Sequence, residues 1–421
     1  MTACRFAALT CLVILPLAAQ LKPKDVRAIA KDGSKAIPRL RELLKDKDPA
    51  IRAEAAKSIG EINSAQGLDA LLEAMKDNHP EVQIRATDGL VNFYLPGYLQ
   101  TGLTARIRGV GKAVPFRSAG ENDQVVEPYV QVRPDVIETL GKTSRGGSSM
   151  DSRANAARAV GILRGKAAVP ELLEAMRSKD SKVIYESLVA IQKIQDRSAA
   201  PRIRYLLNDF DERVQIAAIQ ATGLLRAEES AADVAQVYSR TKKTHVRKAA
   251  LFALAHIPDP NSRALFQQML TDKDEDLRSA AAEGLGRLRK KEDMDVLRKA
   301  FESEGKPSAR LSMAFGLVML GDLELSEFSP LQTLINTLNS KARQGEALAL
   351  LEELTRNEEV RRKVLPVLAT GTKDEKIYIA RALGRSGGAE SVGPLEKLTD
   401  DVEPEVAQEA IRASKSVKSR L

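Results

Sequence analysis

The chain repeats one pattern of residue types at intervals of about 31 residues, and this repeat restricts the possible folds more than any other feature. Three segments show it plainly: LLKDKDPAIRAEAAKSIGEI (43–62), LLNDFDERVQIAAIQATGLL (206–225) and MLTDKDEDLRSAAAEGLGRL (269–288). In each segment an apolar pair is followed by an Asp, a charged turn, a Val, Ile or Leu, and a stretch rich in small residues. This order predicts two short helices joined by a tight turn.

One position fixes the register of the repeat, and we call it the register position. It is occupied first by Gly60, and its equivalents follow at steps of 31, 70, 31, 31, 32, 31, 32, 34, 32 and 31 residues. The step of 70 holds one complete helix pair at 134–163, which leaves an insertion at about 96–133. The equivalents are Val91, Gly161, Gln192, Gly223, Ala255, Gly286, Val318, Glu352, Gly384 and Lys415.

No single unit of this length can bury its own apolar face, so stacked neighbours must complete the core. Prolines open the first helix of several units, where the missing N–H has no partner to lose. Alanine pairs in the second helix allow neighbouring helices to approach closely. We therefore predict an all-α superhelix of ten to eleven helix pairs, capped by a short helix at about 23–31. The prolines are Pro38, Pro170, Pro201, Pro366 and Pro394.

The pattern of an Asp, a six-residue step to an Arg, an adjacent β-branched residue and a terminal Leu-Gly or Ile-Gly resembles the HEAT-repeat family. It is most similar to the short bacterial HEAT-like repeats of the phycobilisome lyase type. The resemblance covers nearly all of 36–415 and implies that second helices line a concave face that binds peptides or proteins. It also implies that the Asp and Arg residues form a structural ladder. Asp46 with Arg52 and Asp272 with Arg278 match fully, whereas Asp77 with Gln83 and Asp209 with Gln215 lack the Arg.

The first twenty residues read as an export signal. Arg5 is followed by an apolar run from Phe6 to Leu17 and by the small residues Ala18 and Ala19. A membrane-spanning helix needs about 20 apolar residues, so this run is short for that role. We expect a signal peptide at 1–20 with cleavage near Ala19, a mature solenoid at 21–421, and a periplasmic or secreted location. A retained N-terminal anchor is the alternative.

Several kinds of chemistry lack the residues that they need. Both cysteines, Cys4 and Cys11, lie in the signal segment, so the mature chain has no thiol for a disulfide, a metal site or catalysis. The histidines His79, His245 and His256 are scattered, which predicts surface or capping roles rather than a metal centre. We therefore expect no catalytic residue, no cofactor and no metal.

The formal net charge of +8 comes from a mixed surface of 65 basic and 57 acidic residues. Two basic clusters stand out, at 239–248 and 287–291, and both are expected in turns on opposite edges of the solenoid. They would not merge into one groove, and no aromatic residues are interleaved with them. Nucleic-acid binding is therefore not expected.

The insertion is the most individual part of the sequence, because it concentrates aromatic and basic residues. Long loops in regular arrays are often functional, and aromatics with Arg are typical of interfaces. The alternative is a loop that folds back and covers local core. The candidate partner-binding residues are Tyr94, Tyr98, Arg106, Arg108, Lys112, Phe116, Arg117 and Tyr129.

These observations favour an exported, non-catalytic scaffold for protein–protein interactions. The alternative, by similarity to the phycobilisome lyases, is a lyase-type enzyme or chaperone. A cluster of ionisable residues with perturbed pKa values in one concave pocket would favour the enzyme.

Overall fold

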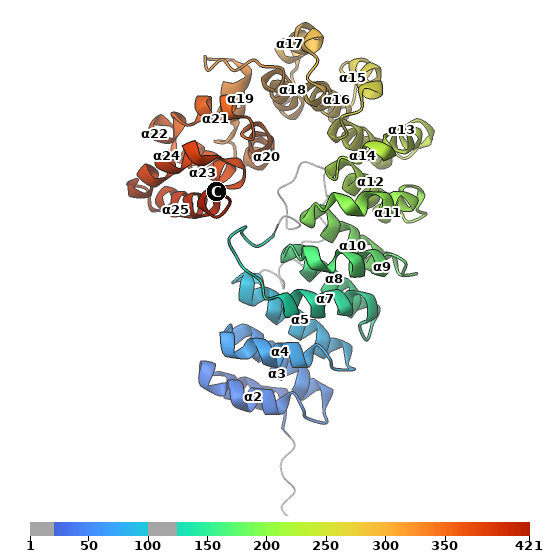
Figure 1. The fold of residues 1–421 in the computed structure, drawn as a ribbon, viewed down its shortest axis with the longest axis vertical. Coiled ribbons are helices and arrows are strands. Elements are labelled where there is room, and N and C mark those ends of the chain that lie inside the picture. The colour runs from blue at the N-terminus through green and yellow to red at the C-terminus, as the bar shows by residue number, and fades with distance from the viewer. Residues whose placement is uncertain (1–20, 100–123) are drawn as a thin grey trace, which may run out of the picture.

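The computed structural model describes residues 21–99 and 124–421, and throughout these ranges the only regular structure is helical. Helix α1 (Pro23–Ala30) caps the array, and eleven helix pairs follow it. Figure 1 shows the pairs stacked into a curved superhelix, so the predicted all-α solenoid is confirmed. The expected signal segment, 1–20, lies outside the described residues.

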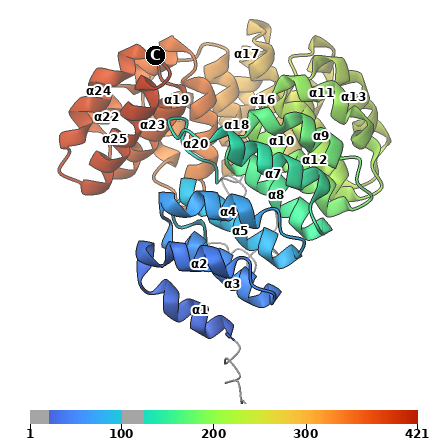
Figure 2. The same ribbon diagram turned by 60° about the horizontal axis from the view of Figure 1, so that its bottom comes forward.

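The first helix of each pair lies on the outer side of the curve in Figures 1 and 2, and every one except α7 is shorter than its partner. Pro38 and Pro170 occupy its first turn as expected. In the tenth unit this helix is divided in two. The first helices are α2 (Ile37–Leu43), α4 (Leu68–Ala74), α7 (Pro134–Gly146), α9 (Val169–Ala175), α11 (Ala200–Ile203), α13 (Ala231–Arg240), α15 (Arg263–Met269), α17 (Met294–Ser303), α19 (Pro330–Thr337), α21 (Glu358–Val364) with α22 (Val367–Thr370), and α24 (Val392–Lys397).

The second helices line the concave side, as the family resemblance implied. Several begin with an Asp N-cap, such as Asp180, whose carboxylate accepts from the backbone N–H groups of Lys182 and Val183. They are α3 (Pro49–Ile62), α5 (Pro80–Tyr94), α8 (Met150–Ile162), α10 (Ser181–Ile194), α12 (Glu212–Leu224), α14 (Thr244–His256), α16 (Glu275–Leu288), α18 (Pro307–Met319), α20 (Gln344–Leu354), α23 (Lys373–Ser386) and α25 (Pro404–Lys418).

Where the register position is a glycine, the second helix closely approaches the next one. A Cβ built on Gly286 would lie 2.6 Å from the Cα of Gly316, and one on Gly60 would lie 2.6 Å from the Cα of Gly89. No side chain fits at such a distance, so glycine is required at these two contacts. The repeat of the sequence is therefore the repeat of the helix contacts.

The predicted Asp–Arg ladder is present. Arg52 donates through Nε and Nη2 to both carboxylate oxygens of Asp77 in the next unit, at 2.6 and 3.0 Å. Its Nη1 donates to the carbonyl oxygen of Asp46, six residues earlier, at 2.9 Å. Where Gln83 replaces the Arg, its Nε2 donates to the carbonyl of Asp77 and its Oε1 accepts from Ser148 of the following unit. These residues join neighbouring units.

The C-terminal units curl back toward the middle of the array, so that α20 and α23 face α10 and α12 across the concave side (Figure 1). Lys415 of α25 places its Nζ 4.4 Å from the ring centroid of Tyr129. Residues that are far apart in the sequence therefore meet in the interior of the curve.

Candidate functional site

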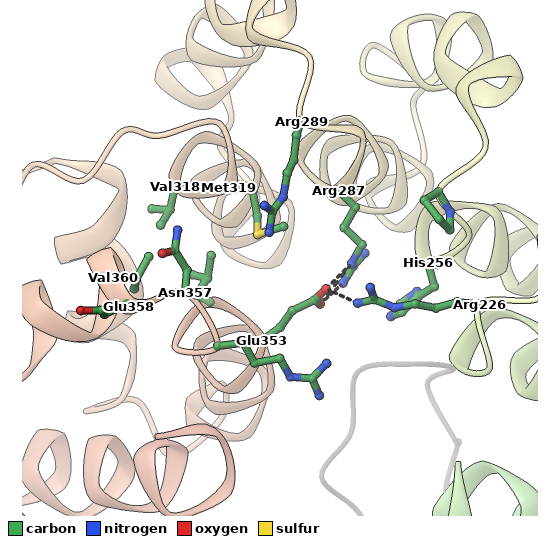
Figure 3. A pocket seen from close by; sticks show the side chains of 13 residues that line it. Arg226, His256, Arg287, Arg289, Val318, Met319, Glu353, Asn357, Glu358 and Val360 are labelled. Carbon is green, nitrogen blue, oxygen red and sulfur yellow. Dashed lines mark hydrogen bonds and ion pairs between the residues drawn. The ribbon is translucent and has the colours of Figure 1, made fainter. Parts of the chain in front are cut away.

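A pocket of about 480 Å³ lies on the concave side, between the C-terminal ends of α12, α14, α16 and α18 and the segment that joins α20 to α21 in the next unit. Its ionisable wall consists of four arginines, a histidine and two glutamates (Figure 3). The apolar side chains of Val318, Met319, Leu354 and Val360 also line the pocket, and Met319 lies beside Arg289 in Figure 3. The ionisable residues are Arg226, His256, Arg287, Arg289, Glu353, Arg356 and Glu358.

Glu353, in the last turn of α20, points between two arginines of other units (Figure 3). Its Oε2 accepts from Nη2 of Arg287 at 2.8 Å, and its Oε1 accepts from Nη2 of Arg226 at 3.1 Å. Arg287 also donates to Glu283 at 3.0 Å, and Glu283 accepts from the hydroxyl of Ser312 at 2.9 Å. One carboxylate thus holds α20 to α16 and to the end of α12.

The charges of this cluster are strongly coupled. Burial is the largest single influence and would raise the pKa of Glu353, but the charge and hydrogen bond of Arg287, together with the charge of Arg226, outweigh it and lower this pKa to about 2. Burial lowers the pKa of His256 to about 4, and the positive charge of Arg287 adds to the effect. At neutral pH the cluster therefore contains an ionised Glu353 and an uncharged His256, whose Nδ1 lies 2.9 Å from the carbonyl oxygen of Phe252.

Arg289 and Arg356 complete the basic wall. Both are exposed, and neither guanidinium forms an ion pair within the part of the chain that the structure describes. Arg289 has a left-handed backbone with φ of 53°, and Arg226 has φ of 52°. A non-glycine residue pays about 1 kcal/mol for this conformation. Arg289 and Arg226 occupy equivalent positions in the repeat, because they lie three residues after Gly286 and Gly223 respectively.

The insertion candidates divide into two groups. Tyr94 and Tyr98 are partly buried against the core, and the hydroxyl of Tyr94 accepts from the backbone N–H of Arg133 at 3.2 Å. Burial raises the pKa of Tyr98 to about 12. Tyr129 contacts Lys415, as described above. Arg106, Arg108, Lys112, Phe116 and Arg117 lie outside the described residues, so their role in partner binding stays a prediction.

One expectation from the sequence needs correction. Arg287 was expected in a turn between units, but it lies in the last turn of α16 with a side chain only 6% exposed. His256, expected on the surface or as a cap, ends α14 with its Nδ1 2.9 Å from the carbonyl oxygen of Phe252, and its ring faces the central pocket. Both residues directly follow a register position in the sequence, and both side chains face the interior of the curve.

Within 21–99 and 124–421, no three His, Cys, Asp or Glu side chains are grouped closely enough to hold a metal ion. Over the same residues no helix has the length and apolar character needed to cross a bilayer.

The fold and the pocket define a superhelical repeat protein with a charged concave centre. The family model for HEAT repeats matches residues 25–91, 137–223, 169–254 and 235–317, which together exceed half of the sequence. The chain belongs to the HEAT-repeat family.

No curated protein matches the chain. Among solved structures, an engineered protein is similar at 19% identity and a TM-score of 0.40, covering 91% of this chain and 98% of its own. The complex of CpcE and CpcF of phycocyanin lyase from Nostoc sp. PCC7120 is similar at 18% identity and a TM-score of 0.34. That match covers 79% of this chain and 97% of the matched one.

Proposed function

We propose that the chain is an exported, non-catalytic scaffold that binds protein partners along its concave side. The observation that carries this proposal is the inner surface of second helices, which contains a pocket lined by both charged and apolar side chains. Superhelices of stacked repeats use extended concave surfaces of this kind for binding.

The alternative is a lyase-type enzyme or chaperone, and the charged pocket is the feature that favours it. A general acid or base works best with a pKa near the working pH. Glu353 and His256, with pKa values of about 2 and 4, are both displaced well below neutrality. Their displacement follows from ion pairing and burial, which supports a structural and binding role for the cluster.

Site-specific photocrosslinking tests the binding surface. A photoreactive amino acid at Met319, in the pocket, is compared with one at Glu302 on the outer helix α17. We expect Met319 to form protein adducts in cells and Glu302 to form few. Adducts that arise only from Glu302 would place the partner surface on the convex side and refute the proposal.

Export rests on the sequence of residues 1–20 and is tested separately. A fusion of these residues to a reporter that is active only outside the cytoplasm should gain activity, and Arg5→Glu should reduce it. The mass of the purified mature protein should correspond to cleavage near Ala19. A cytoplasmic protein of full mass would contradict export while leaving the scaffold proposal to the crosslinking test.

A further inference from the structure

The described part of the insertion, 124–133, reaches toward the C-terminal units in Figures 1 and 2, and we call it the strap. Val126 is 3% exposed, and its N–H donates to the carbonyl oxygen of Ile162, at the end of α8, at 2.9 Å. At the other end of the strap, the N–H of Arg133 donates to the hydroxyl of Tyr94 at 3.2 Å. Both ends of the strap are therefore fixed to units of the N-terminal half.

The middle of the strap contacts the last helix of the chain. Tyr129 lies under the ammonium group of Lys415, with 4.4 Å between Nζ and the ring centroid. Burial raises the pKa of the Tyr129 hydroxyl, and the charge of Glu127 adds to this rise. Arg412 of α25 lowers the same pKa and Glu409 raises it, so this ring lies among the charges of α25. Lys415 is exposed, and a cation–π contact at an exposed site is weak. The contact can therefore break while the ends of the strap stay fixed.

The units of α19 to α25, which we call the arm, approach the N-terminal half at a second place. Arg385 of α23 donates to Glu352 of α20 at 2.6 Å. Burial lowers the pKa of Arg164, which lies just after α8, and the charge of Arg385 lowers it further. Glu127 of the strap and Glu352 of the arm act in the opposite direction. The end of α8, the strap and the arm therefore share one charged region.

The arm joins the rest of the array through an irregular junction. The step from Val318 to Glu352 is 34 residues, the longest apart from the step that contains the insertion. Segment 320–329, between α18 and α19, is not helical, and its backbone has positive φ at Gly321 (108°) and at Phe328 (71°). Hinges are formed by a few loop residues of this kind, which absorb changes in backbone angles. The central pocket lies at the same junction, where α18 and α20 line it.

We propose that the arm turns about segment 320–329 and that the strap latches it closed through the contact between Tyr129 and Lys415. This contact belongs to the last helix of the arm, far along the chain from the hinge, so a weak interaction acts there with a long lever. Glu353 supplies a second closing contact nearer the hinge. Release of the latch opens the concave side to a partner, and this last step rests on the proposed function.

Distances between spin labels test the latch in the full chain. Cys4→Ser and Cys11→Ser leave no native thiol, so that labels attach only to introduced cysteines. Lys179→Cys, before α10, and Gln408→Cys, on α25, are exposed sites that report how far the arm lies from the N-terminal half. We expect one narrow distance distribution in this labelled chain. Lys415→Gln and Tyr129→Leu should each add a component at longer distance, and an unchanged distribution in both variants overturns the inference.

The matched control removes the same kind of contact within one unit. The guanidinium of Arg247 lies 4.9 Å from the ring centroid of Tyr238, and α13 and α14 carry these residues. Arg247→Gln should therefore leave the label distances unchanged. A longer component equal to that of the strap variants would mean that loss of any cation–π contact loosens the array, and would overturn the latch.

Access to the concave side is tested with the photoreactive amino acid at Met319. Lys415→Gln should increase the yield of protein adducts in cells relative to Arg247→Gln. Equal yields would refute the role of the latch in partner access. If no chain forms adducts from Met319, the proposed function itself fails, whereas the label distances still decide whether the strap holds the arm.

Discussion

Glu353 accepts a hydrogen bond from Arg226 at 3.1 Å, although 127 positions separate the two residues. The same carboxylate accepts from Arg287, 66 positions away. Most contacts in a solenoid join a unit to its immediate neighbours. Here one side chain joins three units that do not follow one another, so the inner side of the superhelix is bridged by ion pairs.

Replacing Glu353 tests this role. Glu353→Gln removes the carboxylate that pairs with Arg226 and leaves Arg287 with Glu283 as its remaining partner. Because the cluster is largely buried, we expect the free energy of unfolding to fall by about 3 kcal/mol. Glu352→Gln is the control, because burial raises the pKa of Glu352 and its loss of charge costs less. Urea unfolding measures both. Equal effects for the two variants would contradict the special role of Glu353.

His256 makes stability depend on pH in a defined window. Its pKa is about 4 in the folded chain against a usual 6.5, so the unfolded chain binds the proton more readily. The stabilisation is therefore complete above pH 6.5 and is lost as the pH falls from 6.5 toward 4. The facing charges are Arg287, Glu353 and Glu283. Glu353 itself, with a pKa of about 2, stays ionised through this window.

We expect His256 to account for about 2 kcal/mol of the stability lost over that interval, since one pKa unit corresponds to about 1.4 kcal/mol and the ring is partly exposed. Chemical unfolding at pH 7.5 and pH 4.5 measures the loss in the wild-type protein and in His256→Gln. The variant should lose less. An identical loss in both proteins would show that other groups cause the acid sensitivity.

The helix contact at the register position can be tested with a single methyl group. Gly286→Ala places a Cβ where the Cα of Gly316 leaves only 2.6 Å, so α16 and α18 must move apart. We expect a loss of about 2 kcal/mol. Gly146→Ala is the matched control, because nothing lies within 4 Å of its Cβ. Thermal unfolding should give a lower Tm for Gly286→Ala and an unchanged Tm for Gly146→Ala. An unchanged Tm for Gly286→Ala would mean that the helices adjust freely.

The ladder between units makes a similar contribution. Arg278 donates to both oxygens of Glu304, at 2.6 and 2.9 Å, and also to the carbonyl of Asp272. Arg278→Ala should cost about 2 kcal/mol, because Glu304 is only 7% exposed. Arg85→Ala removes a more exposed pair with Glu81 within one helix and should change stability by less than about 0.5 kcal/mol. Denaturant midpoints compare the two.

The sequence alone predicts the fold well because each unit carries its own signals: the register glycines, the Asp caps and the opening prolines. The central pocket was not predicted, although residues at two positions of the repeat line it. His256, Arg287 and Glu353 each follow a register position by one residue, and Arg226 and Arg289 follow one by three. Reading the units as aligned columns would have shown ionisable residues gathered on the inner side.

An alignment of the repeat units does not show which units face each other across the concave side. The small rotation between successive units accumulates over four steps before Glu353 comes opposite Arg226. That rotation depends on helix contacts such as the one between Gly286 and Gly316, and a spacing of 31 or 32 residues does not encode it. The insertion candidates at 106–117 stay predictions, because the described residues do not include them.

The bridge from α20 to α16 and α12 also changes how the chain can come apart. A repeat array frays from its ends, one unit after another. Fraying from the C-terminus would first release α24 and α25, then α21 to α23. It would next reach Glu353, where release of one more unit exposes a charge cluster shared with units far inside the array. Loss of the unit that contains Glu353 must therefore break contacts with α16 and α12 as well as those with its immediate neighbours, whereas loss of α21 to α25 leaves this cluster intact.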